Sequence, residues 1–127
     1  MKNITQKIIV VTLLVFFFNC TKEDTVERND TSIIPTSSLG RTNQVLGTLN
    51  LSSRNVTISV WDHGQIDGDI VSIYVNGTLI INRKTLSGPT NKIEVSTTLE
   101  YNGYNYILLY AHNEGSISPN TAAIRIE

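Results

Sequence analysis

The stretch V-S-I-Y-V-N-G-T-L-I-I at residues 71–81 decides the fold class of this chain. Apolar and more polar residues alternate up to Asn76-Gly77, and further β-forming residues follow. A period of two places the apolar side chains on one face of a strand. Asn-Gly between two such stretches favours a type I′ turn, which needs positive φ at both central residues. The pattern therefore predicts a β-hairpin formed by residues 70–75 and 78–83.

The same period of two continues on both sides of this hairpin. Further strands are predicted at residues 45–51, 56–61, 92–99, 104–111 and 121–127. Gly, Pro and Asn residues separate these stretches, and no window shows the 3.6-residue period of a helix. The sequence therefore predicts an all-β fold. We expect residues 45–127 to form a small antiparallel β-sandwich of immunoglobulin-like type, with about seven strands.

The beginning of the chain has the layout of a secretory signal. Lys2 and Lys7 precede the apolar stretch I-I-V-V-T-L-L-V-F-F-F at residues 8–18. As a helix this stretch would rise about 16 Å, whereas the hydrocarbon core of a membrane is about 30 Å thick. A signal peptide is therefore favoured over a transmembrane anchor.

Cys20 directly follows this stretch and is the only cysteine, so it has no intramolecular disulfide partner. The residues F-F-N-C at 17–20 resemble the lipobox of bacterial lipoproteins, in the looser form found in Bacteroidota. This resemblance implies a signal peptide at residues 1–19 that is removed by signal peptidase II, and palmitate attached at Cys20. It places the protein in the cell envelope, anchored in the outer membrane. K-E-D at residues 22–24 resembles a signal for display at the cell surface.

Residues 20–44 have the composition of a linker. Polar and charged side chains dominate, Pro35 and Gly40 interrupt the segment, and no periodicity persists. Such a segment cannot bury enough apolar surface to offset its chain entropy. We therefore expect a flexible tether that joins the lipidated cysteine to the domain.

Two stretches of the predicted domain carry a second resemblance. W-D-H-G-Q-I-D-G-D-I-V-S-I-Y-V-N-G at 61–77 and L-L-Y-A-H-N-E-G-S-I-S-P-N-T-A-A-I at 108–124 resemble a small accessory β-module of secreted proteins and lipoproteins of Bacteroidota. The similarity extends over residues 56–127. It implies no activity, and no catalytic residue follows from it.

The charge and the histidines exclude two classes of function. The chain has 10 Lys+Arg against 11 Asp+Glu, so there is no basic excess for a nucleic-acid partner. His63 and His112 are the only histidines, and neither lies in a nucleophile or zinc motif. We therefore predict that the protein is not an enzyme.

Asp62, Asp67 and Asp69 form the first candidate site. Three carboxylates in one glycine-containing loop offer the hard oxygen ligands that Ca²⁺ prefers. The spacing is not that of an EF-hand. The alternative is a connecting loop in which aspartates bond to backbone groups of turns, with no cofactor.

Aromatic side chains form the second candidate site. Strand parity places Trp61, Tyr74, Tyr106 and Tyr110 on outward positions, where they would form a stacking platform for a sugar. The alternatives are that these residues are simply good strand formers, or that their face is the buried one.

These observations predict a membrane-anchored lipoprotein whose β-sandwich is a non-enzymatic binding or structural module. One alternative is a carbohydrate-binding module that depends on calcium or on the aromatic platform. The other is an inhibitor or immunity-type lipoprotein. The predicted partners are the membrane, through the lipid, and either a glycan or an envelope protein.

Overall fold

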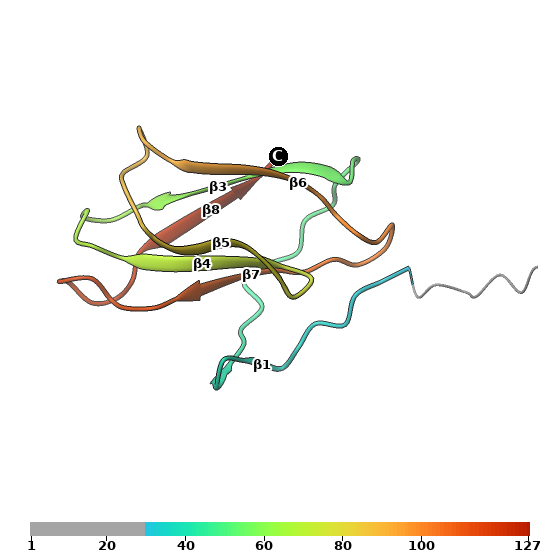
Figure 1. Cartoon of the computed structure of the whole chain (residues 1–127), viewed down its shortest axis with the longest axis horizontal. Helices are drawn as coiled ribbons and strands as arrows, with labels where there is room; N and C mark the ends of the chain where they lie inside the picture. Colours follow the sequence, from blue (N-terminus) through green and yellow to red (C-terminus); the bar gives the residue numbers. More distant parts are fainter. Residues whose placement is uncertain (1–29) are drawn as a thin grey trace, which may run out of the picture.

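The computed structural model describes residues 30–127, and the predicted signal peptide and Cys20 lie outside this range. The described residues form an all-β structure (Figure 1). Two three-stranded antiparallel sheets pack against each other, and a separate two-stranded hairpin precedes them. The prediction of a small antiparallel β-sandwich is confirmed. None of the described residues forms a helix long and apolar enough to cross a membrane.

Each sheet has one central strand that is paired on both sides. The first sheet has the order β6 (Ile93–Thr98), β3 (Asn55–Asp62) and β8 (Ala122–Ile126). The second sheet has the order β5 (Thr78–Thr85), β4 (Ile70–Val75) and β7 (Ile107–Ala111). The first sheet therefore pairs strands that are far apart in the sequence, because Val60 lies between Ile93 on one side and Ile124 on the other.

The core lies between the two sheets and follows the alternation of the sequence. Its buried apolar residues are Val56, Ile58, Val60, Val71, Ile73, Val75, Ile81, Leu86 and Leu99. Alternate residues of each central strand point inward because successive side chains of a strand lie on opposite faces. Burial of this apolar surface is the main force that holds the two sheets together.

The hairpin predicted from Asn-Gly is present between β4 and β5. Asn76 has φ of 49° and Gly77 has φ of 86°, which are the positive values that the predicted turn requires. The register between the two strands shifts on both sides of Ile73, which marks a bulge. The local sequence therefore determined both the turn and the pairing of these strands.

The prediction of a strand at residues 45–51 is wrong. This segment has no assigned strand, and its apolar side chains are exposed: Val45 by 71%, Leu46 by 89%, Leu49 by 62% and Leu51 by 42%. An additional strand next to β3 would need a free edge, but β6 and β8 occupy both of its edges. Neither edge of β3, the next strand in the sequence, is therefore available to this segment.

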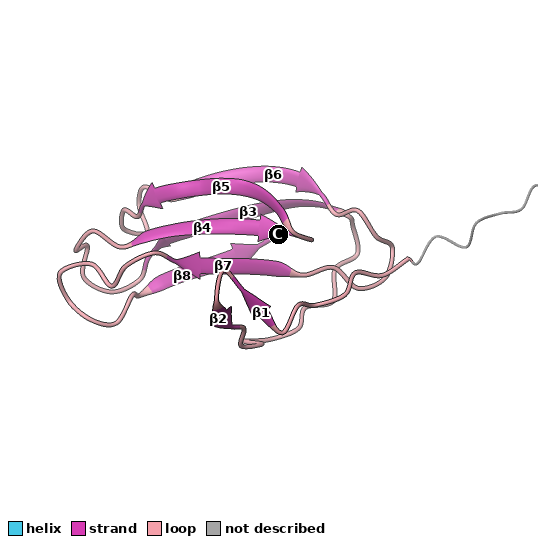
Figure 2. Ribbon diagram, turned by 60° about the horizontal axis from the view of Figure 1, so that its bottom comes forward, coloured by secondary structure: helices cyan, strands magenta, loops and turns pink. Residues whose placement is uncertain are grey.

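Residues 30–43, which we call the docked segment, lie against the sandwich. They contain the short strands β1 (Ser37–Ser38) and β2 (Arg41–Thr42), which lie beside β7 in Figure 2. Arg41 donates a hydrogen bond of 2.7 Å from Nη1 to the carbonyl oxygen of Ala111 in β7. The polar composition had predicted a flexible tether up to residue 44. Within the described part, the segment is bonded to the domain instead.

The loops of the sandwich gather at opposite ends of the molecule (Figure 1). Loops 63–69, 86–92 and 112–121 lie at one end, which we call the three-loop end. The turn 76–77 and loop 99–106 lie at the other, which we call the hairpin end. Asp62 and Asp69 flank the first loop of the three-loop end, so the candidate aspartates belong to that end.

Candidate functional site

The structure brings the three predicted aspartates together. One carboxylate oxygen from each of Asp62, Asp67 and Asp69 lies within 4.8 Å of one from each of the others. Asp62 and Asp69 are fully buried, whereas Asp67 is partly exposed. Asp62 ends β3 at an inward-facing position, and Asp69 precedes β4 with the parity of the buried Val71. Two carboxylates thus take positions where strand parity would place core residues.

Two of the carboxylates are held by Thr121, which precedes β8. The Thr121 hydroxyl donates to Asp62 Oδ1 at 2.7 Å, and its backbone N–H donates to Asp69 Oδ2 at 2.7 Å. The backbone N–H of Gly64 donates a second hydrogen bond to Asp62 Oδ1 at 3.0 Å. Gly64 approaches closely, since a Cβ there would lie 2.6 Å from the Thr121 hydroxyl. Thr121 was missed by the sequence analysis because the pairing of β8 with β3 brings it here.

The third carboxylate links two loops of the three-loop end. Asp67 Oδ2 accepts a hydrogen bond of 2.7 Å from the backbone N–H of Ile117. The carbonyl oxygen of Asp67 accepts another, of 3.0 Å, from the N–H of Ser116. Gly115, at φ of 62°, packs so closely that any Cβ would meet the Asp67 carboxylate. Loop 63–69 is therefore fitted onto loop 112–121 through Asp67.

Each carboxylate has one oxygen that these bonds leave without a partner. The oxygens are Asp62 Oδ2, Asp67 Oδ1 and Asp69 Oδ1, and all three are buried atoms. Within the described residues, no lysine, arginine or histidine forms an ion pair with any of the three aspartates. Buried polar atoms nearly always have a hydrogen-bond partner. Three exceptions in one cluster make these aspartates the best candidate site of the described structure.

The two histidines differ in their surroundings, and only His112 belongs to a side-chain network. Its Nδ1 lies 2.8 Å from Arg83 Nη1, and its Nε2 lies 2.8 Å from Ser72 Oγ. A guanidinium can only donate, so Nδ1 accepts and the ring proton lies on Nε2. Because Ser72 is fully buried, its hydroxyl is closed to a substrate. This network connects neighbouring strands, and the arrangement of His112 is not that of a base beside an accessible nucleophile.

His112 gives the fold a dependence on pH. Partial burial and the positive charges of Arg83 and Arg41 lower the pKa of His112 below its usual 6.5. As the pH falls through about 6.5, the unfolded chain takes up a proton before the folded one. This contribution to stability is therefore present above pH 6.5 and is lost as the pH falls below it.

We expect urea unfolding to show a drop in the free energy of unfolding from pH 7.5 to pH 5.5 that is smaller in His112→Gln. The slopes of the free energy of unfolding against pH should differ between the two proteins by less than one proton per molecule, because a single shifted group contributes no more than that. His63→Gln is the matched control and should keep the full pH dependence. An equal loss in both variants would assign the effect to other groups.

The aromatic residues predicted as one platform do not share a surface. Trp61 lies on the outer face of the sheet β6-β3-β8, whereas Tyr74 and Tyr110 lie on the outer face of the other sheet. Tyr106 directly precedes β7 of that second sheet, and its hydroxyl lies beside Gly77 in the turn between β4 and β5. The four side chains therefore belong to two surfaces that face away from each other.

The faces of two of these rings are already covered by cations. Lys92 Nζ lies 4.6 Å from the centre of the Trp61 ring, and Arg125 Cζ lies 6.0 Å from it. Arg41 Cζ lies 4.6 Å from the centre of the Tyr110 ring. Cation–π contacts of this kind occupy the ring face that a sugar would need. The four residues therefore do not form one continuous platform, and whether any of them binds a sugar stays a prediction.

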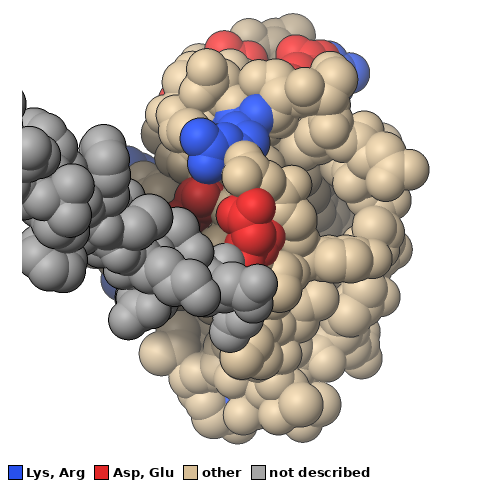
Figure 3. Space-filling model, turned by 90° about the vertical axis from the view of Figure 1, so that its right-hand side faces the viewer, with Lys and Arg blue, Asp and Glu red and all other residues tan. Residues whose placement is uncertain are grey.

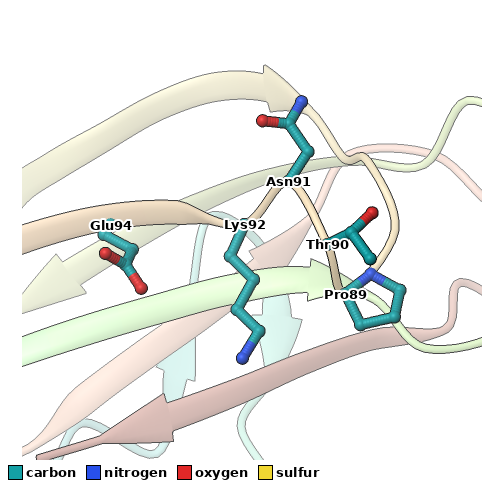
Figure 4. A pocket seen from close by; sticks show the side chains of 5 residues that line it. All are labelled: Pro89, Thr90, Asn91, Lys92 and Glu94. Carbon is teal, nitrogen blue, oxygen red and sulfur yellow. The ribbon is translucent and has the colours of Figure 1, made fainter.

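A hollow of about 330 Å³ lies on the loop before β6 (Figure 4). Its lining residues are Pro89, Thr90, Asn91, Lys92 and Glu94. The side chains of Asn91 and Lys92 point to opposite sides of the loop, so they do not converge on one ligand. This hollow lacks the combination of an apolar wall and convergent polar groups that is typical of small-molecule sites.

Comparison with protein-family models, with curated proteins and with solved structures found no match to this chain.

Proposed function

We propose that this chain is a membrane-anchored lipoprotein whose β-sandwich is a non-enzymatic binding or structural module that presents its three-loop end away from the membrane. The lipid would be attached at Cys20, as the resemblance of residues 17–20 to a lipobox implies. The observation that carries the proposal is the place where the chain enters the domain. It enters at the hairpin end, opposite the three loops.

The entry point is fixed by backbone contacts between the docked segment and loop 99–106. The N–H of Gly103 donates to the carbonyl oxygen of Asp30 at 2.7 Å. The N–H of Ser32 donates to the carbonyl oxygen of Tyr104, also at 2.7 Å. Gly103 is needed for this approach, because a Cβ would lie 2.5 Å from the Asp30 carbonyl oxygen. Residue 30 is therefore held at the hairpin end.

The point of attachment, together with the short distance to Cys20, then biases the orientation of the domain relative to the lipid. The stretch from Cys20 to Asp30 can span at most about 35 Å, even when fully extended. The central strands of the sandwich add about 20–27 Å between the hairpin end and the three-loop end. Because the tether joins the domain at the hairpin end, that end should on average stay nearer to the bilayer, with the three-loop end pointing outward.

The surface charge of the hairpin end is consistent with a domain orientation that is set by where the chain is attached. Figure 3 shows this end of the molecule, and most of the visible surface there is uncharged. Acidic and basic side chains lie close together near its centre. On the part of this face that the described residues form in Figure 3, basic side chains are mixed with acidic ones, whereas anionic headgroups bind clusters of Lys and Arg. The contacts of the docked segment are thus the feature that orients the domain.

Energy transfer in vesicles tests this orientation. Asn91→Cys labels the three-loop end and Thr78→Cys labels the hairpin end, since both residues are exposed. The full chain would be reconstituted in vesicles that contain an acceptor dye on the lipid headgroups. A lipid-bound Cys20 would leave the introduced thiol as the only one that a donor dye can label.

We expect clearly higher transfer efficiency from position 78 than from position 91, because transfer falls with distance from the bilayer. Gly103→Val should release the docked segment and reduce the difference between the two positions. Gly47→Ala is the control, because nothing lies within 4 Å of a Cβ at that position. Equal transfer from both positions in the unaltered protein would contradict the proposed orientation.

A further inference from the structure

We propose that Asp62, Asp67 and Asp69 bind one Ca²⁺ ion, and that this ion locks loop 63–69 onto loop 112–121 at the three-loop end. The site stands on the described residues alone and does not depend on the lipid anchor. Three carboxylates by themselves are a common surface feature. Here, two of them are fully buried and each has an oxygen that accepts no hydrogen bond from a described residue.

The buried carboxylates lack the partners that would stabilise their charge. Removing a carboxylate from water is costly unless hydrogen bonds or an opposite charge replace the water. Here hydrogen bonds satisfy only one oxygen of each group, and like charges a few ångströms apart also repel each other. A bound cation in contact with one oxygen of each carboxylate would supply the missing opposite charge for all three groups at once.

The spacing of the carboxylates suits calcium. Calcium takes oxygen ligands at about 2.3–2.6 Å, so two oxygens on one ion can be as much as about 5 Å apart. The ligand oxygens of the three aspartates lie within 4.8 Å of one another. Magnesium needs shorter bonds of about 2.0–2.1 Å and a stricter octahedral geometry. Zinc prefers histidine and cysteine ligands, and this cluster contains neither.

The hydrogen bonds of the other carboxylate oxygens prepare the site. Thr121 holds Asp62 and Asp69, and the N–H of Ile117 holds Asp67. Groups that orient the ligands of a metal in this way fix its coordination geometry. The same bonds connect β3, the loop before β4 and the loop before β8. An ion between the aspartates would therefore tie together segments that come from both sheets.

The experiment is a thermal melt of the full chain purified in detergent, first freed of metal with chelator. Calcium at a hundredfold excess over its dissociation constant should raise the melting temperature by about 10 °C. Calorimetric titration should give one bound ion per chain. Magnesium at the same concentration should produce a much smaller shift. An equal response to magnesium would overturn the assignment to calcium.

Variants separate the site from a general effect of ions. Asp69→Asn and Asp67→Asn should each abolish most of the calcium response. In the absence of metal both should melt at or above the temperature of the unaltered apo protein, because the substitution removes one of three repelling charges. Glu114→Gln is the control: it removes an exposed carboxylate of loop 112–121 and should leave the calcium response unchanged.

Two results would overturn the proposal. One is a melting temperature that does not move between chelator and calcium, together with no heat of binding. The other is a calcium response that persists at full size in Asp67→Asn, which keeps the two fully buried aspartates intact. If Asp69→Asn fails to fold, this second variant still decides the question, because Asp67 is partly exposed.

Discussion

Replacing Ile73 with alanine should lower the free energy of unfolding by about 2–5 kcal/mol. Ile73 is 0% exposed and lies in the middle of β4, the central strand of its sheet. It pairs with Ile81 of β5 on one side and with Leu109 of β7 on the other. The substitution removes buried methyl and methylene groups and leaves a cavity that a close-packed core cannot fill.

The loss is large relative to the whole stability of such a domain. A folded unit of about 70 residues has a free energy of unfolding of roughly 4–11 kcal/mol. Urea unfolding of the two proteins measures the difference directly. Leu79→Ala is the matched control, because Leu79 is 42% exposed on the neighbouring strand and should cost about 1 kcal/mol or less. Equal losses in both variants would mean that the core does not lie where the structure places it.

The sequence predicted the elements that depend on neighbouring residues. Asn76-Gly77 sets the turn because both residues adopt positive φ, and the strands on either side then pair with little freedom. The inward positions of β3 and β4 follow directly from the alternation of apolar and polar residues. Burial confirms that parity for Ile58 and Ile73 alike.

The misplaced strand at residues 45–51 shows where local patterns fail. Its apolar residues have suitable types for a strand, but a strand is stable only when it finds a partner edge. Strand β8 takes the free edge of β3, and it lies at the other end of the sequence. The alternation of residues within a segment does not show which of two candidate strands pairs with that edge.

The same distinction explains the two candidate sites. Asp62, Asp67 and Asp69 are close in the sequence, so one loop was enough to predict their proximity. Their hydrogen-bond donors Thr121 and Ile117 lie some fifty residues further along the chain, and only the tertiary fold brings them near. Trp61 is separated from the three tyrosines for a related reason. Strand parity indicates inside or outside, but it does not indicate to which sheet a strand belongs.

The docked segment could not have been predicted from composition. Its residues are polar, and a polar segment can be held by backbone hydrogen bonds without burying apolar surface. Asp30 and Ser32 bond to the backbone of loop 99–106, and Arg41 bonds to the backbone of β7. These contacts tie the described part of the predicted tether to the domain.

Replacing Cys20 with serine should abolish the mature, membrane-bound lipoprotein. This loss is the second large effect that we expect. Two or three acyl chains hold a lipoprotein far more firmly than the single chain that gives only reversible binding. Serine cannot form the thioether that carries the diacylglycerol. The chain should therefore accumulate as an uncut precursor or appear in the soluble fraction.

Fractionation, labelling with palmitate and mass measurement of the purified chain distinguish these forms of the Cys20→Ser variant. Thr21→Ser is the matched control, because it changes the neighbouring residue and keeps the only cysteine of the chain. It should retain the label and the membrane location. The expected label in the Cys20→Ser variant is none, since no other thiol is present. If that variant still ran at the mature size in the membrane fraction, the anchor would lie elsewhere. The proposed orientation would then be unsupported, because it assumes that the lipid is attached ten residues before Asp30.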